Sequence, residues 1–209
     1  FSNLNDFQII KKLITKINNS SEYTNPIVIA GAGPTGVELA CKISDLIKDR
    51  VEIHLVDKGD KILPTCKSFN REKAIDAIQK RNIKVFLDCC IKSVDKTSLE
   101  LSTTDNETNN FIEIDYSSLI WTAGLKPAKT KFVNYFLNQY QKIKVNQFMQ
   151  MDEYKNIFFV GDITFCENAP FPSSAQVAMQ QGSLVAQNII SLRKGNELKP
   201  FQFDDLGEM

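Results

Sequence analysis

The stretch that decides the fold is Gly31-Ala32-Gly33-Pro34-Thr35-Gly36, a G-x-G-x-x-G pattern. It directly follows the apolar run 27–30, which is typical of a strand buried on both faces, and it opens a predicted helix over 35–49. Alone this pattern is a weak signal, but between a strand and a helix it indicates a phosphate-binding turn. We therefore expect the first β-α-β unit of a dinucleotide-binding domain here.

Each residue of this turn has an expected task. Gly31 allows the sharp turn out of the strand, Gly33 lets a pyrophosphate approach the backbone, and Gly36 lets helix and strand pack closely. Pro34 and Thr35 begin the helix, where unpaired N–H groups and the positive end of the helix dipole would face the phosphates. A glycine turn without any ligand is the alternative.

Asp57 follows the next predicted strand, over 51–56, and lies 21 residues after Gly36. A carboxylate there can accept hydrogen bonds from both hydroxyls of an adenosine ribose and would repel a 2′-phosphate, which favours NAD(H) over NADP(H). Lys58 weakens this preference slightly. A chance acid at the end of a strand is the alternative.

Two further ionisable residues lie near this turn in the sequence. Glu38 is expected in the first turn of the helix, where it either complements the helix dipole or points into the cofactor cleft near the nicotinamide. His54 is the only histidine and lies in a predicted strand. We expect it to be structural, so neither a histidine general base nor a Ser-His-Asp triad is predicted.

The composition excludes several classes of protein. Because 25 basic residues balance 25 acidic ones, a nucleic-acid binder held by bulk charge is not expected. No apolar run approaches the roughly 18–20 residues of a membrane span, so we expect this segment to be soluble. The five cysteines form no C-x-x-C pair, and neither a disulfide framework nor a metal site is predicted. The vicinal pair Cys89-Cys90 is expected to be buried as small apolar residues.

The order of predicted elements over 23–127 is β-α-β-α-β, a meander and a closing strand, a complete Rossmann-like α/β pattern. Beyond the first unit these elements are a helix over 68–81 with Ala74, Ile75, Ala77 and Ile78 toward a sheet, strands over 83–94, 98–104 and 111–116, and a last strand over 119–122.

Two flanking segments complete the chain. Residues 1–22 are predicted to form a helix and a linker, with one apolar helical face made by Leu4, Phe7, Ile10, Leu13, Ile14 and Ile17. Residues 128–209 are predicted to hold a buried strand over 157–160 that ends at Gly161-Asp162, and a helix over 174–193 with Gly195 as its C-terminal cap. Because the sequence begins at Phe1, we expect it to be a piece of a longer protein.

Several stretches, in family order over about residues 23–209, resemble type II NADH dehydrogenases. Those enzymes are membrane-associated flavoproteins that pass electrons from NADH through FAD to a quinone. The matching stretches are IVIAGAGPTGVELA (27–40), VDKGDKILP (56–64), LIWTAG (119–124), NIFFVGD (156–162), AQVAMQQG (175–182) and FQFDDLGEM (201–209).

The resemblance implies a flavoprotein with two dinucleotide-binding domains. Only one glycine fingerprint is present, and its position and Asp57 assign it to NAD. The chain would then hold the whole NADH domain, over 23–127. Residues 1–22 and 128–209 would be parts of an FAD domain, too incomplete to retain FAD by themselves.

The resemblance also assigns individual residues. Gly161 and Asp162 would reach the ribityl or pyrophosphate part of FAD, and Glu38 would be the acid near the nicotinamide–flavin junction. The start of the last helix would lie under the isoalloxazine beside the quinone site. The residues implied there are Ala175, Gln176 and Gln180, and the turn implied on the nicotinamide side is Ala123-Gly124.

The intact protein is accordingly expected to be a peripheral membrane enzyme on the cytoplasmic, matrix or stromal side, attached through a C-terminal region absent from this sequence. Uncovered apolar faces of the flavin-domain segments would favour a homodimer instead. Two other functions stay open. One is an NAD(H)-binding module without activity, and the other is an FAD-dependent NADH reductase with a soluble acceptor.

Overall fold

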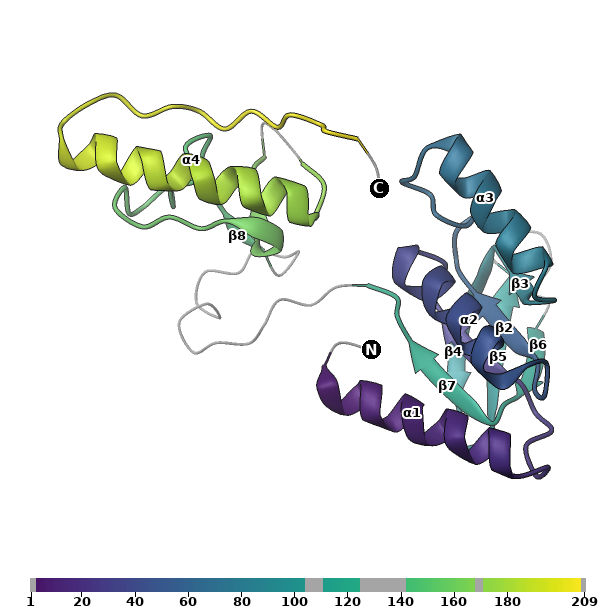
Figure 1. The fold of residues 1–209 in the computed structure, drawn as a ribbon. Helices are drawn as coiled ribbons and strands as arrows, with labels where there is room; N and C mark the ends of the chain where they lie inside the picture. The colour runs from purple at the N-terminus through teal and green to yellow at the C-terminus, as the bar shows by residue number, and fades with distance from the viewer. Residues whose placement is uncertain (1–2, 104–110, 125–141, 168–170, 208–209) are drawn as a thin grey trace. The chain divides into compact units, whose positions relative to one another are not determined.

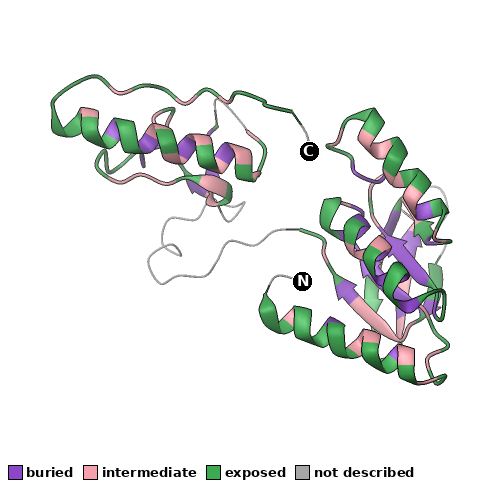
Figure 2. Cartoon of the chain, viewed as in Figure 1, coloured by how far each residue is buried: buried purple, intermediate pink, exposed green. Residues whose placement is uncertain are grey.

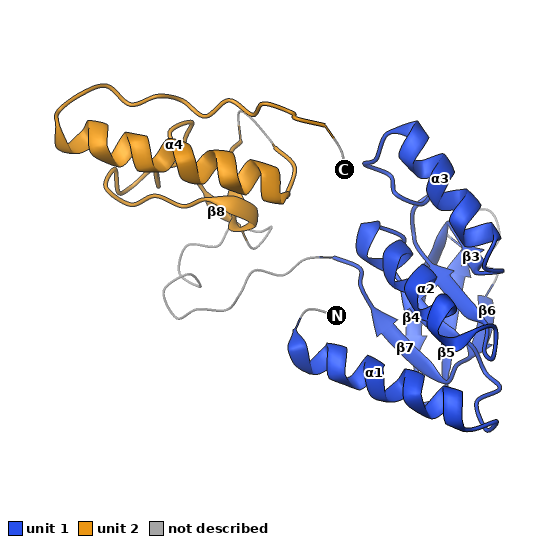
Figure 3. Ribbon diagram, in the orientation of Figure 1, with its two compact units in different colours: residues 1–124 blue, residues 125–209 orange. Residues whose placement is uncertain are grey.

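The computed structural model describes residues 3–103, 111–124, 142–167 and 171–207. The chain divides into two compact units, residues 1–124 and 125–209, which are described separately (Figure 3). The domain boundary expected after residue 127 lies outside the described residues.

The first unit is built on a four-stranded parallel sheet with the order β3-β2-β1-β7 (Figure 1). The chain passes from β1 to β2 and β3 on one side and then returns to β7 on the other. The strand order therefore reverses beside β1, where open α/β sheets bind ligands at their carboxyl ends. The strands are β1 (Ile27–Ala30), β2 (Ile53–Val56), β3 (Lys84–Phe86) and β7 (Ser118–Trp121).

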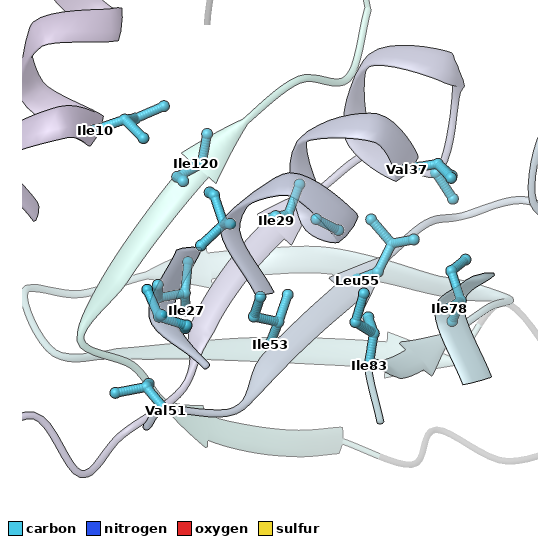
Figure 4. Close-up of a cluster of buried hydrophobic side chains, with 14 of the residues drawn as sticks. Ile10, Ile27, Ile29, Val37, Val51, Ile53, Leu55, Ile78, Ile83 and Ile120 are labelled. Carbon is cyan, nitrogen blue, oxygen red and sulfur yellow. The ribbon is translucent and has the colours of Figure 1, made fainter. Parts of the chain in front are cut away.

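Three helices contribute to the apolar cluster on one face of this sheet (Figure 4). Because side chains alternate along a strand, Ile27 and Ile29 of β1 face the same way as Ile53 and Leu55 of β2. All four are at most 3% exposed. The helices are α1 (Leu4–Asn19), α2 (Pro34–Ile47) and α3 (Ser68–Gln79).

An antiparallel meander with the order β4-β5-β6 packs against the opposite face of the sheet. Val28 and Val56 join a second cluster there with Leu99, Leu101 and Ile114. The expectation that 27–30 is a strand buried on both faces is therefore confirmed (Figure 2). The meander strands are β4 (Cys89–Val94), β5 (Ser98–Thr103) and β6 (Phe111–Asp115).

The helical faces are narrower than the sequence pattern predicts. In α1 only Ile10 and Ile17 are buried, whereas Leu4 and Phe7 are 72% and 53% exposed. In α3 the exposed Ile75 likewise does not join the core. Only the α1 residues that lie over the sheet find apolar partners, so helical spacing alone overstates the buried face.

The segment 1–22 belongs to the same compact unit as the fold that follows it. Its helix α1 begins at a capping box between Asn3 and Asp6 and packs its buried isoleucines into the core of the first unit. Its assignment to an FAD domain in the intact protein stays a prediction.

The second unit has its own apolar cluster, which includes Ile143, Met149, Cys166 and Val185. The strands β8 (Ile143–Lys144) and β9 (Thr164–Phe165) pair in parallel, and α4 (Ala175–Arg193) contributes to the same cluster. Gly195 has a φ of 70°, and its N–H donates to Leu192 3.2 Å away, which confirms the predicted helix cap.

The prediction of a buried strand over 157–160 is wrong. Phe158 makes one isolated antiparallel bridge to Gln150, the rest of the segment has no strand structure, and Val160 is 38% exposed. An apolar run becomes a doubly buried strand only between two partner strands and two layers. Among the described residues, this segment pairs with backbone on one side only, through the bridge between Phe158 and Gln150.

His54 is a polar exception within the buried strand β2. Its Nε2 lies 3.0 Å from the Glu52 carboxylate, its ring centroid lies 5.3 Å from that of Phe86, and its Nδ1 has no partner among the described residues. Burial lowers the pKa of His54, while the hydrogen bond to Glu52 opposes that shift. The imidazole is therefore neutral at neutral pH, as expected for a structural histidine.

This burial predicts an acid-sensitive fold. The unfolded chain binds a proton at His54 more readily than the folded chain, so stability falls as the pH drops below the ordinary histidine pKa of about 6.5. When the pH is lowered from about 7.5 to about 5.5, we expect the unfolding temperature of His54→Phe to fall less than that of the wild type. Thermal unfolding of both proteins measures this, and parallel pH profiles would exclude His54 as the cause.

Candidate functional site

The glycine turn brings three elements into close contact at the carboxyl ends of the strands. Gly31 has a φ of 110°, and a Cβ on it would lie 2.8 Å from Thr122 Oγ1 and 2.9 Å from Ala123 N. A Cβ on Gly36 would collide with the carbonyl oxygen of Gly31. These two glycines therefore hold the start of α2 against the ends of β1 and β7, as predicted.

Gly33 differs from its two neighbours in the pattern. A Cβ on it would meet nothing within 4 Å, so the protein itself does not require glycine at this position. Gly33 is the N-cap of α2 and offers no side-chain cap, while Pro34 has no N–H to satisfy. Open space in front of unpaired backbone N–H groups is the arrangement that suits an anionic ligand such as a pyrophosphate.

Asp57 braces this turn from the end of β2. Its Oδ2 accepts a hydrogen bond from Ala32 N at 2.6 Å, and its Oδ1 accepts one from Gly59 N at 2.8 Å. Each carboxylate oxygen keeps a second lone pair that a ribose hydroxyl can use. The residue therefore has a structural task in addition to the predicted one, and its backbone contacts fix where the carboxylate lies.

A pocket of about 420 Å³ opens at this edge of the sheet. Trp121, half exposed, lies at its side and donates from Nε1 to Ala123 O at 2.9 Å. The lining comprises the ends of β1, β2 and β7 and the start of β4: Ala30, Gly31, Gly33, Val56, Asp57, Lys58, Pro64, Cys89, Cys90, Ile91, Trp121, Thr122, Ala123 and Gly124.

The two vicinal cysteines were expected to be buried together, and only one of them is. Cys89 is buried and Cys90 is half-buried, and both line the pocket because β4 starts beside the end of β2. Burial, with the nearby Asp88 carboxylate, raises the pKa of the Cys89 thiol. That thiol is therefore protonated at neutral pH and contributes a neutral, weakly polar wall.

Glu38 does not lie where the sequence argument placed it. It is the fifth residue of α2, whose first turn contains no acid, and so the dipole role expected for it is weakened. Its side chain is exposed and lies outside the lining of the 420 Å³ pocket. A role at the nicotinamide–flavin junction stays a prediction that needs the rest of the protein.

In the second unit, Gly161 and Asp162 form a short 3-10 turn, Gly161–Ile163, against α4. Gly161 has a φ of 77°, its N–H donates to Gln181 Oε1 at 2.6 Å, and its carbonyl accepts from Thr164 Oγ1 at 2.7 Å. Asp162 is exposed on this fixed backbone. A glycine in a left-handed conformation followed by an exposed carboxylate fits a hydroxyl-rich ligand such as the ribityl part of FAD, because a carboxylate accepts hydrogen bonds from hydroxyl groups.

Gln176 and Gln180 hold the backbone of the C-terminal segment. Gln180 donates to Asp204 O at 2.7 Å and accepts from Asp204 N at 3.0 Å. Gln176 makes longer bonds to Leu206 N and Gly207 O, at 3.3 and 3.4 Å. In these contacts each side-chain amide pairs with backbone as a neighbouring strand would, which gives both glutamines a structural role.

These contacts build a groove between α4 and the C-terminal segment. Asn188 continues the same pattern, because it exchanges two 2.9 Å hydrogen bonds with Lys199. Met179, 74% exposed, lies between the two glutamines, and Ala175 is exposed as the first residue of the helix. The resulting groove has a volume of about 480 Å³ and is lined by Gln176, Met179, Gln180, Ser183, Leu184, Gln187, Pro200, Phe201, Gln202 and Leu206.

The described parts of the chain contain neither a cluster of metal ligands nor a helix suited to cross a membrane. No group of three or more histidine, cysteine, aspartate or glutamate side chains is placed there to hold a metal ion. None of the helices within those parts is both long and apolar enough to cross a membrane.

Apart from Glu38, the predicted NAD-side residues lie together in the first unit, whereas Cys89 to Ile91 and, in the second unit, Gln181 were not predicted. Cys89 to Ile91 enter the pocket wall through the register of the meander, for which no local signal exists. Gln181 could have been found from helical periodicity, because it lies on one stripe of α4 with the buried Val177, Val185 and Asn188.

Comparisons with known proteins agree with this geometry. A family model for pyridine nucleotide-disulphide oxidoreductases matches residues 2–182. The chain is 28% identical over 214 residues to a demethylphylloquinone reductase from Synechocystis, covering 100% of this chain and 52% of that protein. It is 27% identical over 195 residues to a type II NADH:quinone oxidoreductase from Staphylococcus aureus, covering 87% and 48%. The chain therefore spans about half the length of these relatives.

The fold is also found in solved structures. NDH2 from Plasmodium falciparum, solved in complex with NADH, superposes with a TM-score of 0.62 at 24% identity, over 77% of this chain and 36% of that one. The expected fold class, an α/β Rossmann-like domain with a meander of the pyridine nucleotide-disulphide oxidoreductase type, is confirmed. Because the family model matches well over half of the residues, this chain belongs to the pyridine nucleotide-disulphide oxidoreductase family.

Proposed function

We propose that the first unit binds NADH and that the intact protein transfers electrons from NADH through FAD to a quinone. The observation that carries the proposal is the pocket at the strand ends, where Gly33 leaves the helix start open and Asp57 is fixed beside it. The pyrophosphate would lie against the N-terminus of α2, and the adenosine ribose would lie at Asp57. The nicotinamide would then lie toward Ala123 and Gly124.

FAD, when bound, would accept a hydride from NADH and supply the electrons for quinone reduction. The chain's own residues bind and orient. The glycine turn and Asp57 would hold the nucleotide half of NADH, and the exposed Asp162 would bind a polar part of FAD. Holding two reacting rings in contact is the largest contribution that such a protein can make to the rate.

Three residues are proposed for the reacting ends of the substrates. Glu38 would adjust the geometry, or move a proton, near the nicotinamide. Gln176 and Gln180 would border the quinone in the groove along α4 while they also hold the C-terminal segment. The apolar lining from Met179, Leu184 and Phe201 suits a lipophilic ring better than a charged acceptor.

Attachment to a membrane surface through a region outside this sequence, on the cytoplasmic, matrix or stromal side, belongs to the same proposal. Sedimentation of the full-length protein with lipid vesicles tests it. Self-association is the competing use of uncovered apolar side chains, such as Leu4 and Phe7 on α1. Analytical ultracentrifugation of this chain alone measures it.

The two other functions are separated by one experiment on the purified full-length protein. We expect a yellow protein with flavin absorbance that oxidises NADH faster with a lipophilic quinone than with ferredoxin or a dye. A colourless protein that still binds NADH would be a nucleotide-binding module. Rapid turnover with only the soluble acceptors would identify the other kind of reductase.

Trp121, the only tryptophan, borders the pocket and can report on a bound nucleotide. Bound NADH should quench its emission by energy transfer to the nicotinamide, and NADPH should do so more weakly because Asp57 repels a 2′-phosphate. Fluorescence titration of this chain with each nucleotide measures the difference. An equal response to both would contradict the role of Asp57, and no response would remove the nucleotide site.

Substitutions on α4 distinguish a role of Gln176 and Gln180 in quinone binding from their role in holding the C-terminal segment. In the full-length protein, Gln176→Leu and Gln180→Leu should raise the KM for quinone about tenfold and leave turnover with a soluble dye unchanged. Glu38→Gln should lower turnover with both acceptors. Gln187→Leu is the matched control, since it lines the same groove without holding the C-terminal segment.

If Gln176 and Gln180 only hold the C-terminal segment, their variants will unfold at lower temperature. The KM for quinone will then be unaltered. Unchanged turnover and NADH affinity in Glu38→Gln would remove that residue from the mechanism.

A further inference from the structure

Gln180 and Gln181 are neighbours on α4, and Gln181 is the buried one. Its neighbour Gln180 lies in the groove, whereas Gln181 is 0% exposed and points into the second unit. Few polar side chains are completely buried, and those that are normally use their full hydrogen-bonding capacity. A fully buried amide therefore requires a specific partner for its oxygen and for its nitrogen.

The oxygen of Gln181 has such a partner, and the partner belongs to the predicted flavin turn. Gly161 N donates to Oε1 at 2.6 Å. Because a backbone N–H can only donate, this bond fixes the orientation of the amide and places Nε2 on the other side. Nε2 is buried and has no hydrogen-bond partner among the described residues. One end of the amide is thus in use, and the other end is an unused donor.

Gly161, the first residue of this turn, makes further contacts that hold its backbone in place. The carbonyl of Gly161 is bound by the Thr164 hydroxyl at 2.7 Å, and a Cβ on Gly161 would lie 3.5 Å from Ala178 Cβ on α4. Asp162 follows this fixed residue and is exposed. The backbone that carries Asp162 is thus held against α4 by the hydrogen bond from Gly161 N to Gln181 Oε1.

We propose that Gln181 is a positioning residue for FAD. Its Oε1 fixes the Gly161–Asp162 turn so that the carboxylate faces the flavin nucleotide, and its Nε2 donates to an oxygen acceptor that is in place only when FAD is bound. The inference rests on the proposed function, because it assumes that the intact protein binds FAD. Gln181 would thus position the flavin turn, whereas Gln176 and Gln180 line the groove proposed for the quinone.

The test uses the full-length protein and three variants. Gln181→Met removes both hydrogen-bonding ends and keeps a long unbranched side chain. Gln181→Glu keeps an acceptor and removes the donor when its carboxyl group is ionised, so its affinity for FAD is measured over a range of pH. Gln79→Met is the control, since it makes the same change at an exposed position of α3 that lines neither pocket. For each protein, FAD is removed, and the Kd for added FAD and the flavin midpoint potential are measured beside the unfolding temperature without FAD.

We expect both Gln181 variants to raise the Kd for FAD about tenfold or more and to shift the flavin potential, with the control unchanged. A lower unfolding temperature with wild-type FAD affinity and potential would show a merely structural residue and overturn the proposal. Wild-type affinity in Gln181→Glu alone would overturn the donor role of Nε2.

A measurement on the wild type keeps the proposal testable if a variant fails to fold. Hydrogen exchange at the Gly161 amide should be slow without FAD and slower with it, because the amide is bound by Gln181 in both states. Rapid exchange without FAD would overturn the proposal. A wild-type protein that binds no FAD would instead refute the proposed function.

Discussion

The contact between the backbone of Gly31 and that of Gly36 is the constraint on which the pocket depends. It places the first turn of α2 directly on the ends of β1 and β7, and no side chain fits between them. With the helix held there, its unpaired N–H groups face the edge of the sheet where the strand order reverses. Asp57 fixes the same turn from the side of β2 through Ala32. A small part of the chain thus holds an open helix N-terminus at the edge of the sheet.

Much of the first unit could be predicted from the sequence because its signals are local. The apolar run 27–30, the glycine pattern and Asp57 follow one another within a single β-α-β unit. The strands β5 and β6 of the meander were also visible as separate runs, but the prediction of one strand over 83–94 is wrong. That run contains β3, which belongs to the parallel sheet, and β4, which belongs to the meander. The register of the meander was not visible, and this is why the entry of Cys90 into the pocket wall could not be predicted.

The second unit was predicted less well because its structure depends on contacts distant in the sequence. Gln180 meets Asp204 and Gln181 meets Gly161, pairings of side chain with backbone that no periodicity reveals. The run 157–160 is as apolar as 27–30 and yet forms no strand. The difference is in its neighbours, since β1 lies between two strands and two layers while Phe158 has a single bridge. Local pattern indicates what a segment can become, and its partners determine whether it does.

The central claim is that the glycine turn is open for a nucleotide, and Gly33 tests it most directly. Because a Cβ at Gly33 meets no protein atom within 4 Å, Gly33→Val should fold with nearly the wild-type unfolding temperature. Its new side chain would occupy the space proposed for the pyrophosphate. Calorimetric titration of this chain with NADH should show at least about a tenfold rise in Kd for Gly33→Val. Equal affinity for NADH in the wild type and a folded Gly33→Val would contradict the account.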